Sequence, residues 1–155
     1  MILFRKADKK DLEFLFNLRN EEAVRLVSFN SNPISLDAHR EWFEKKLSSG
    51  DSFIFIAEFD GQPIAQARFD LDHNNGEAEI NIAVTENFRG KGYGSEILKS
   101  LSQQFLKDFP KIEAVRAFVK PDNPASLRSF EKAGYKICGK AVRKGCQCVE
   151  MILTR

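Results

Sequence analysis

Residues 87–101 read NFRGKGYGSEILKSL and place three alternating glycines directly before an amphipathic run of apolar side chains. Glycine loses much backbone entropy on folding, so its repetition at a helix start indicates a special backbone shape. Alternating apolar residues predict a strand over EAEINIAV (77–84) before the glycines and another over KIEAVRAFV (111–119) after the helix. This strand–helix–strand crossover predicts parallel, right-handed neighbours, with the glycine loop at the carboxyl end of the first strand.

Further elements extend on both sides of this crossover. A type I′ turn at Asp60-Gly61 predicts a hairpin, and the segment 21–33 has no regular period. Caps, apolar periods and breakers predict helices at residues 8–20, 35–47, 95–109 and 123–133, strands at 2–7, 52–59, 63–71, 77–84 and 111–119, and a final hairpin at 135–153. The predicted order is β-α-α-β-β-β-α-β-α-β-β, without a linker, so we expect one domain over residues 1–155.

Composition excludes several classes of protein. The net charge of +2, from 24 basic and 22 acidic residues, is too balanced for a nucleic-acid-binding surface. No apolar run approaches the roughly 20 residues of a membrane span, and the N-terminus lacks a secretory signal, so we expect a soluble, cytoplasmic protein that binds no membrane. Three cysteines, Cys138, Cys146 and Cys148, and two distant histidines predict neither a disulfide framework nor a metal site.

The glycine loop suits an anionic ligand. Alternating glycines let backbone N–H groups point into one concavity at the positive end of the helix, and Arg89 and Lys91 add cations to the same loop. The dinucleotide pattern G-x-G-x-x-G fails because Ser95 occupies its last position, and no Gly-Lys-Ser/Thr triplet completes a phosphate loop. A pyrophosphate cradle is therefore favoured, and a purely structural tight turn is the alternative.

Two motifs carry a resemblance to a known family. Arg89-Gly90-Lys91-Gly92-Tyr93-Gly94 resembles the Arg/Gln-x-x-Gly-x-Gly/Ala signature of the GNAT N-acetyltransferases, and the segment 123–135 resembles their Asn-x-x-Ala/Ser-x-x-x-Tyr-x-x-x-Gly-Phe element. The element order agrees from residue 2 to residue 153. Scattered positions resemble the RimJ/RimL-type branch and, within it, enzymes that acetylate a nucleotide-linked amino sugar on the route to pseudaminic acid.

The resemblance implies a single α/β domain, α+β by some schemes, with a mixed, mostly antiparallel sheet of about seven strands and about four helices. It also implies that acetyl-CoA is the acyl donor, with its pyrophosphate on the glycine loop and its pantetheine arm along the 77–84 strand. A backbone N–H between Ile82 and Val84 would polarise the thioester carbonyl. The implied acetyl-CoA contacts are Ile82, Ala83, Val84, Arg89, Gly90, Lys91, Gly92, Tyr93, Gly94, Ser95, Asn123, Ser126 and Phe130.

The proton transfers have one candidate base and no obvious acid. Alternation in the 77–84 strand puts Glu79 and Asn81 on one face, where Glu79 would deprotonate the amine and Asn81 would orient water or substrate. The alternative is that this face is merely solvated. Phe130 stands where many members have a proton-donating tyrosine. Ser126, Tyr93 and Tyr135 are substitutes, although Tyr135 is expected to pack behind its helix.

The acceptor pocket should be formed by the first two helices and the adjacent strands. Its candidate polar or aromatic residues are Asn20, Arg25, Trp42 and Arg68, although helical spacing also fits Trp42 and His39 as core. We expect a small-molecule amine acceptor, such as a nucleotide-linked amino sugar whose phosphates meet Arg25 or Arg68. Acetylation of a protein N-terminus and a non-catalytic CoA-binding module are the alternatives. A homodimer would pair through the end strand VEMIL (149–153).

Overall fold

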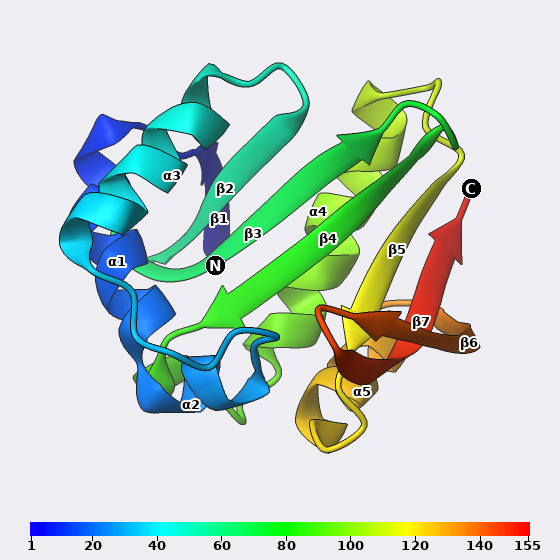
Figure 1. The fold of residues 1–155 in the computed structure, drawn as a ribbon. Helices are drawn as coiled ribbons and strands as arrows, with labels where there is room; N and C mark the ends of the chain where they lie inside the picture. Colours follow the sequence, from blue (N-terminus) through cyan, green and yellow to red (C-terminus); the bar gives the residue numbers. More distant parts are fainter.

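A single seven-stranded sheet organises the molecule in the computed structural model, which describes residues 1–155. The strand order across the sheet is β1-β2-β3-β4-β5-β7-β6 (Figure 1). The strands are β1 (Ile2–Lys6), β2 (Ser52–Phe59), β3 (Gln62–Asp72), β4 (Glu77–Val84), β5 (Ala114–Val119), β6 (Lys136–Arg143) and β7 (Cys146–Thr154). The α-helices are α1 (Leu12–Asn20), α2 (Glu22–Val27), α3 (Leu36–Ser48), α4 (Tyr93–Asp108) and α5 (Pro124–Lys132), with short 3₁₀ turns at Lys9–Asp11 and Glu86–Phe88.

Antiparallel hairpins make up most of the sheet. Asp60 and Gly61, between β2 and β3, have φ of 51° and 77°, and Lys144 and Gly145, between β6 and β7, have φ of 50° and 76°. Positive φ at both central residues is the type I′ geometry, which matches the twist of the flanking strands. The type I′ turn expected at Asp60-Gly61 is therefore confirmed.

The β4–α4–β5 crossover provides the parallel pair of the sheet. β4 and β5 run in the same direction, as predicted for strands joined through a helix. Apolar side chains fix α4 to one face, where the rings of Phe105 on α4 and Phe69 on β3 stack with centroids 4.1 Å apart. This face and α5 enclose the main hydrophobic core.

The opposite face of the sheet is covered over only part of its width. The helices α1 and α3 lie over this part of the sheet (Figure 1). Leu15 of α1 and Phe43 of α3 pack on Ile54 and Ile56 of β2 in a second, smaller core. Over β4, β5 and β7 the same face carries charged side chains, which line a pocket. No helix in the structure is long and apolar enough to cross a membrane.

Three expectations about the elements need correction. Residues 22–27 form the helix α2 inside the segment expected to be irregular, which makes five α-helices rather than about four. α4 begins at Tyr93, two residues earlier than expected, because Gly92 supplies the left-handed N-cap. The segment 149–153 lies in β7, which β5 and β6 flank on both sides, so it has no free edge for pairing a second copy.

Candidate functional site

The glycine loop exposes a helix N-terminus. Gly90 and Gly92 have φ of 73° and 86°, in the left-handed region that glycine adopts without penalty. Gly92 is the N-cap of α4, so no side chain caps the first-turn N–H groups. A Cβ added at either glycine would meet nothing within 4 Å, which leaves open space in front of the loop. Such uncapped N–H groups at the positive end of a helix can bind an anion.

The third glycine and the neighbouring side chains have other roles. A Cβ at Gly94 would lie 3.4 Å from the Ser129 hydroxyl, so this glycine allows α4 and α5 to pack closely. Arg89 donates from Nε to the Val84 carbonyl at 2.8 Å and pairs with Glu21. Two of its three guanidinium nitrogens, Nε and Nη2, are therefore engaged by the protein, and Nη1 is the one left for the expected contact with a pyrophosphate.

Lys91, Tyr93 and Ser95 complete the loop. The Lys91 side chain extends outward, with its ammonium 5.8 Å from the ring centroid of Phe88. Tyr93 packs against Phe88 and Phe59, with ring centroids 5.7 Å apart in both pairs, so its ring is part of the apolar layer under the loop. Ser95 Oγ donates to the Gly92 carbonyl at 3.0 Å. Of these side chains, only Lys91 keeps a charged group available for a ligand.

The main chain of β4 beyond Glu79 has no partner on β5. The two strands pair only from Glu77 with Ala114 to Glu79 with Arg116. β4 nevertheless continues to Val84 and β5 to Val119, and the two ribbons separate in this part (Figure 1). A segment of β4 therefore presents unpaired backbone polar groups to the space between the strands, as a sheet edge would.

The register decides which residues face that space. Thr85 N–H donates to the Ile64 carbonyl of β3 at 2.8 Å. Hydrogen-bonded and non-hydrogen-bonded pairs alternate along an antiparallel ladder, so the odd-numbered residues of β4 bond to β3. Ala83 consequently directs its backbone toward β3, whereas Ile82 and Val84 direct theirs into the gap. The Val84 carbonyl is already used by Arg89, as described above.

Asn123 at the start of α5 offers an amide, whereas Phe130 of the same helix lies in the core. Asn123 Oδ1 accepts from the Ser126 N–H at 3.2 Å, which caps α5 and leaves the amide N–H₂ of Asn123 for another acceptor. Phe130 is buried and meets the Tyr135 ring edge-on at 5.0 Å. The Tyr135 hydroxyl lies 2.7 Å from the buried Ser102 hydroxyl, and burial raises the pKa of Tyr135. Tyr135 is therefore part of the core, as expected from the sequence, and no proton donor to this site.

These features fit the donor that the resemblance implies. A pyrophosphate matches the uncapped N-terminus of α4, and an extended amide-bearing arm matches the free β4 backbone at Ile82 and Val84. Acetyl-CoA has both parts and would bring an acetyl group activated as a thioester. The residues suited to hold it are the backbone of residues 90–95, the gap-facing backbone of β4, and Asn123.

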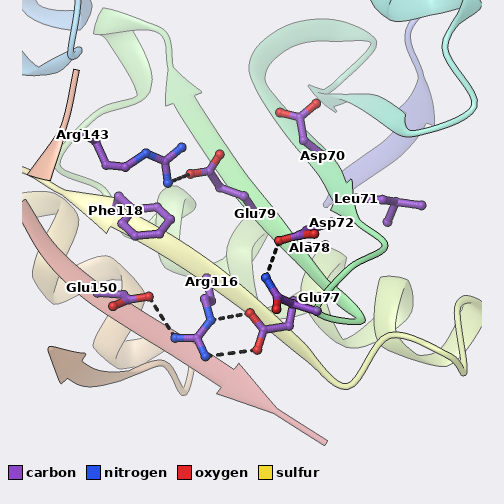
Figure 2. A pocket seen from close by; sticks show the side chains of 11 residues that line it. Asp70, Leu71, Asp72, Glu77, Ala78, Glu79, Arg116, Phe118, Arg143 and Glu150 are labelled. Atoms are coloured by element: carbon purple, nitrogen blue, oxygen red, sulfur yellow. Dashed lines mark hydrogen bonds and ion pairs between the residues drawn. The ribbon is translucent and has the colours of Figure 1, made fainter. Parts of the chain in front are cut away.

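A charged pocket of about 590 Å³ opens on the sheet face opposite α4. Glu79, the candidate base, projects into it from the last paired position of β4, directly before the two strands part. Its carboxylate pairs with Arg143 Nη1 at 2.7 Å and its side chain is 34% exposed (Figure 2). The lining residues are Asp70, Leu71, Asp72, Asn75, Glu77, Ala78, Glu79, Arg116, Phe118, Arg143 and Glu150.

Two arginines in this pocket are held very differently. Arg116 pairs with Glu77 through two nitrogens and with Glu150 at 2.9 Å. The hydrogen bond to Glu77 is the main cause that raises the pKa of Arg116. Arg143 has Glu79 as its one carboxylate partner, and its guanidinium carbon lies 4.1 Å from the ring centroid of Phe118 (Figure 2).

The rim of the pocket is fixed by Asp70. This carboxylate accepts from Arg68 Nε at 2.8 Å, Lys46 Nζ at 2.9 Å and Ser52 Oγ at 2.7 Å. Burial alone would raise the pKa of Asp70, but the charge of Arg68 and these hydrogen bonds together lower it below its usual value. The Arg68 guanidinium also lies over the Trp42 ring, 5.1 Å from its centroid. Two of the four predicted acceptor residues, Trp42 and Arg68, therefore lie at this rim.

Asn20 and Arg25 hold a loop instead of lining the pocket. Asn20 exchanges two hydrogen bonds with the Ile34 backbone, and Arg25 donates to the carbonyls of Asn20 and Ser31. This α2–α3 loop (residues 28–35) reaches the β6–β7 hairpin (Figure 1). There the Cys146 sulfur lies 3.9 Å from the Phe29 carbonyl. The polar groups of Asn20 and Arg25, which were expected to contact the acceptor, thus form hydrogen bonds within the protein.

Asn81 and the residues that sequence reasoning missed lie on the pocket face, whereas His39 belongs to the core between α1 and α3. Asn81 is exposed and accepts from Gln66 Nε2 at 2.8 Å; it lies two residues after Glu79 on β4, on the same face of the sheet. His39 is buried among the rings of Phe16, Trp42 and Phe43, as expected for core. Sequence reasoning missed Asp70, Arg116, Phe118, Arg143 and Glu150. The sequence feature that could have identified them is the alternation of charged and apolar residues along strands that are otherwise buried.

The structure contains no group of three or more His, Cys, Asp or Glu side chains that could hold a metal ion. Cys148 is buried and Cys146 is partly buried on the same face of β7, the arrangement expected from their spacing.

Comparison with known proteins gives one family. A family model described as an acetyltransferase (GNAT) domain matches residues 2–136. The chain is 32% identical over 139 residues to the "Putative phosphinothricin acetyltransferase YwnH" of Bacillus subtilis, covering 84% of this chain and 82% of that protein. It is 21% identical over 146 residues to an L-methionine sulfoximine/L-methionine sulfone acetyltransferase of Pseudomonas aeruginosa, covering 91% of this chain and 84% of that one.

Solved structures share the fold. The aminoglycoside acetyltransferase AAC(6')-Ib, in complex with ribostamycin and coenzyme A, superposes with a TM-score of 0.89 at 21% identity, over 99% of this chain and 93% of that chain. A spermidine N-acetyltransferase from Vibrio cholerae, in complex with CoA and spermine, gives a TM-score of 0.86 at 18% identity, over 99% and 95% of the two chains.

Proposed function

This chain belongs to the GNAT acetyltransferase family and is an acetyl-CoA-dependent N-acetyltransferase, and on that premise we propose that it acetylates a small-molecule primary amine held against Glu79. The observation that carries this proposal is the position of Glu79. It occupies the last paired position before β4 and β5 part, so its carboxylate lies in the pocket while the backbone directly after it faces the gap.

The chain's own groups divide the chemistry between them. Glu79 would accept the proton of the incoming ammonium, a role in which a positioned carboxylate typically contributes about 10²–10⁴-fold to the rate. The gap-facing N–H of Ile82 or Val84 would donate to the acyl oxygen, which is worth about 3 kcal/mol for a donor of this kind. Asn81 would orient the amine or a water beside Glu79.

No tyrosine in the chain is suited to protonate the departing thiolate. Phe130 has no hydroxyl, Tyr135 is buried against Ser102, and Tyr93 packs under the glycine loop. We therefore assign this proton to water. A thiol with a pKa of about 8.5 makes its thiolate a tolerable leaving group, so a dedicated acid is not essential.

The pocket supports a small hydrophilic acceptor. Its volume of about 590 Å³ lies within the range of small-molecule sites, and most of its lining side chains are charged. Two of the relatives described above carry names that refer to small-molecule acceptors, phosphinothricin and methionine sulfoximine. A nucleotide-linked amino sugar remains a prediction. It needs arginines for its phosphates, but Arg25 donates to backbone carbonyls and Arg68 pairs with Asp70.

A free-thiol release assay tests the function. The panel contains amino acids, polyamines, an aminoglycoside, nucleotide-linked amino sugars and a peptide N-terminus. We expect thiol release with at least one small amine, and Glu79→Gln should lower kcat about 10²–10⁴-fold while calorimetry shows unchanged acetyl-CoA binding. Glu113→Gln, an exposed glutamate just before β5, is the matched control.

Two results would contradict the proposal. Acetyl-CoA binding without thiol release from any amine would make the chain a CoA-binding module. Release with the peptide alone would make it a protein N-terminal acetyltransferase. The cytoplasmic location stays a prediction, which cell fractionation would test.

A further inference from the structure

The pairing of Glu79 conflicts with its proposed role. The proposed base must receive an ammonium group, but in the structure its carboxylate is already paired with Arg143 at 2.7 Å. An incoming ammonium that takes this place leaves the Arg143 guanidinium, whose side chain is only 39% exposed, without its anion. A partly desolvated charge without a partner is unfavourable, so the identity of the acceptor decides how this conflict is resolved.

Arg143 is well suited to change partners. It is the last residue of β6, an edge strand, and stands directly before the Lys144-Gly145 turn. Glu79 is its only side-chain partner among the ion pairs and hydrogen bonds of the structure, and its other contact is the flat face of Phe118. A guanidinium can slide over an aromatic face and keep much of the cation–π attraction.

Arg116 shows what a fixed arginine looks like in the same pocket. Its guanidinium is enclosed between Glu77 and Glu150, and it comes from β5, an interior strand (Figure 2). Displacing it would leave two carboxylates without a cation. Of the two arginines, Arg143 is therefore the one whose partner a ligand can replace.

We infer that Arg143 is a specificity-determining residue that selects acceptors carrying an anionic group near the reacting amine, such as amino acids and their analogues. This inference rests on the proposed function of the same pocket. In such a zwitterion the ammonium replaces Arg143 at Glu79, and the carboxylate or an equivalent anion replaces Glu79 at Arg143. Both protein charges are then paired in the complex, whereas an amine without an anion leaves Arg143 unpaired. Planar, two-donor recognition of a carboxylate is the particular strength of arginine.

Matched acceptors test the inference directly. Steady-state rates are measured for amino acids, their carboxamides and the corresponding decarboxylated amines, which share a side chain and differ in the anion. We expect kcat/KM of the wild type to favour the amino acid by about tenfold or more. In Arg143→Gln this preference should disappear, mainly through a higher KM for the amino acid, because the lost contact serves binding rather than proton transfer.

Two further variants separate recognition from structure. Arg143→Lys keeps the charge but not the planar fork, so it should retain part of the preference. Arg40→Gln removes an exposed arginine of α3 that pairs only with Asp37 and should behave as wild type. A general structural defect would lower the rates of all three acceptors together and leave their ratio unchanged.

The possible results separate a failure of this inference from a failure of the proposed function. If amines are acetylated but the amino acid has no advantage over its carboxamide, or keeps its advantage in Arg143→Gln, Arg143 does not select the acceptor and only this inference is overturned. If no amine of any kind is acetylated, the proposed function fails and the inference fails with it.

Discussion

The glycine loop and the charged pocket are built from different kinds of chemical group. The loop consists of backbone groups from one short segment, with Gly90 and Gly92 in left-handed conformations and a helix directly behind them. The pocket consists of side chains from five strands, β3 to β7, arranged as ion pairs. Substitutions should therefore act on the loop through backbone shape and on the pocket through charge, and this difference can be measured.

The largest effect on acetyl-CoA binding is expected at Gly92. A β-branched residue at φ of 86° costs about 1–3 kcal/mol, or forces the loop to change shape. Because the loop presents backbone N–H groups at the N-terminus of α4, we expect Gly92→Val to weaken acetyl-CoA binding about 30- to 100-fold in calorimetry. Acceptor selectivity, judged by the ratio of rates for two acceptors, should not change.

Gly61→Val is the control for this prediction. Gly61 has φ of 77° and, like Gly92, no atom within 4 Å of an added Cβ, but it lies in the β2–β3 turn. Its strain should lower the free energy of unfolding by a similar amount and leave acetyl-CoA affinity unaltered. Equal losses of affinity in both variants would mean that Gly92 acts through stability alone.

The same difference explains what could be predicted from the sequence. The crossover, the seven strands and the loop follow from local signals such as period, caps and alternating glycines, and the structure confirms their order. Asp70, Arg116 and Arg143 lie on three separate strands, and their partners lie 2 to 64 positions away in the chain. The register of the folded sheet brings such residues together. The sequence therefore shows which residues are charged, but it does not show which of them form ion pairs.

The missed helix and the unforeseen hydrogen bonds of two predicted acceptor residues have the same cause. α2 has six residues, too short for its apolar period to stand out, and its end is fixed by contacts with the α2–α3 loop. Asn20 and Arg25 looked like ligand-binding groups because they are polar side chains near the expected pocket. Their hydrogen bonds to backbone carbonyls and an N–H of residues 20, 31 and 34 depend on the path of the loop.

A second prediction tests the contrast between the two arginines. Arg116→Gln leaves Glu77 and Glu150, whose side chains are 21% and 23% exposed, without a cation. We expect a loss of about 2 kcal/mol in the free energy of unfolding, less than for a fully buried pair because water still reaches the site. Arg143→Gln breaks a single, more exposed pair and should cost below about 1 kcal/mol. Urea unfolding measures both, and a reversed order would contradict the assignment of Arg116 as the fixed arginine.

A third prediction concerns pH and the pocket rim. The pKa of Asp70 is lowered in the folded protein, so its contribution to stability is complete above the unfolded value of about 4 and is lost as the pH falls through the lower folded value. Asp70→Asn should cost about 1–2 kcal/mol at pH 7, because Arg68 and Lys46 lose their anion. The difference from wild type should shrink as the pH falls below 4 in urea unfolding. A difference that stays constant down to pH 2 would assign the loss to packing.

The smallest effect on catalysis is expected for Tyr135, which lies in the core beside Phe130. Tyr135→Phe removes one buried hydroxyl and leaves Ser102 Oγ without its 2.7 Å partner, which should cost about 1 kcal/mol of unfolding free energy. Because that hydroxyl lies in the core and burial raises its pKa, kcat should be unchanged between pH 7 and pH 9. Thermal unfolding and the thiol-release assay measure the two quantities on one sample. A tenfold loss of kcat with stability retained would make Tyr135 the acid of the reaction, and the donor side would then depend on a side chain as the acceptor pocket does.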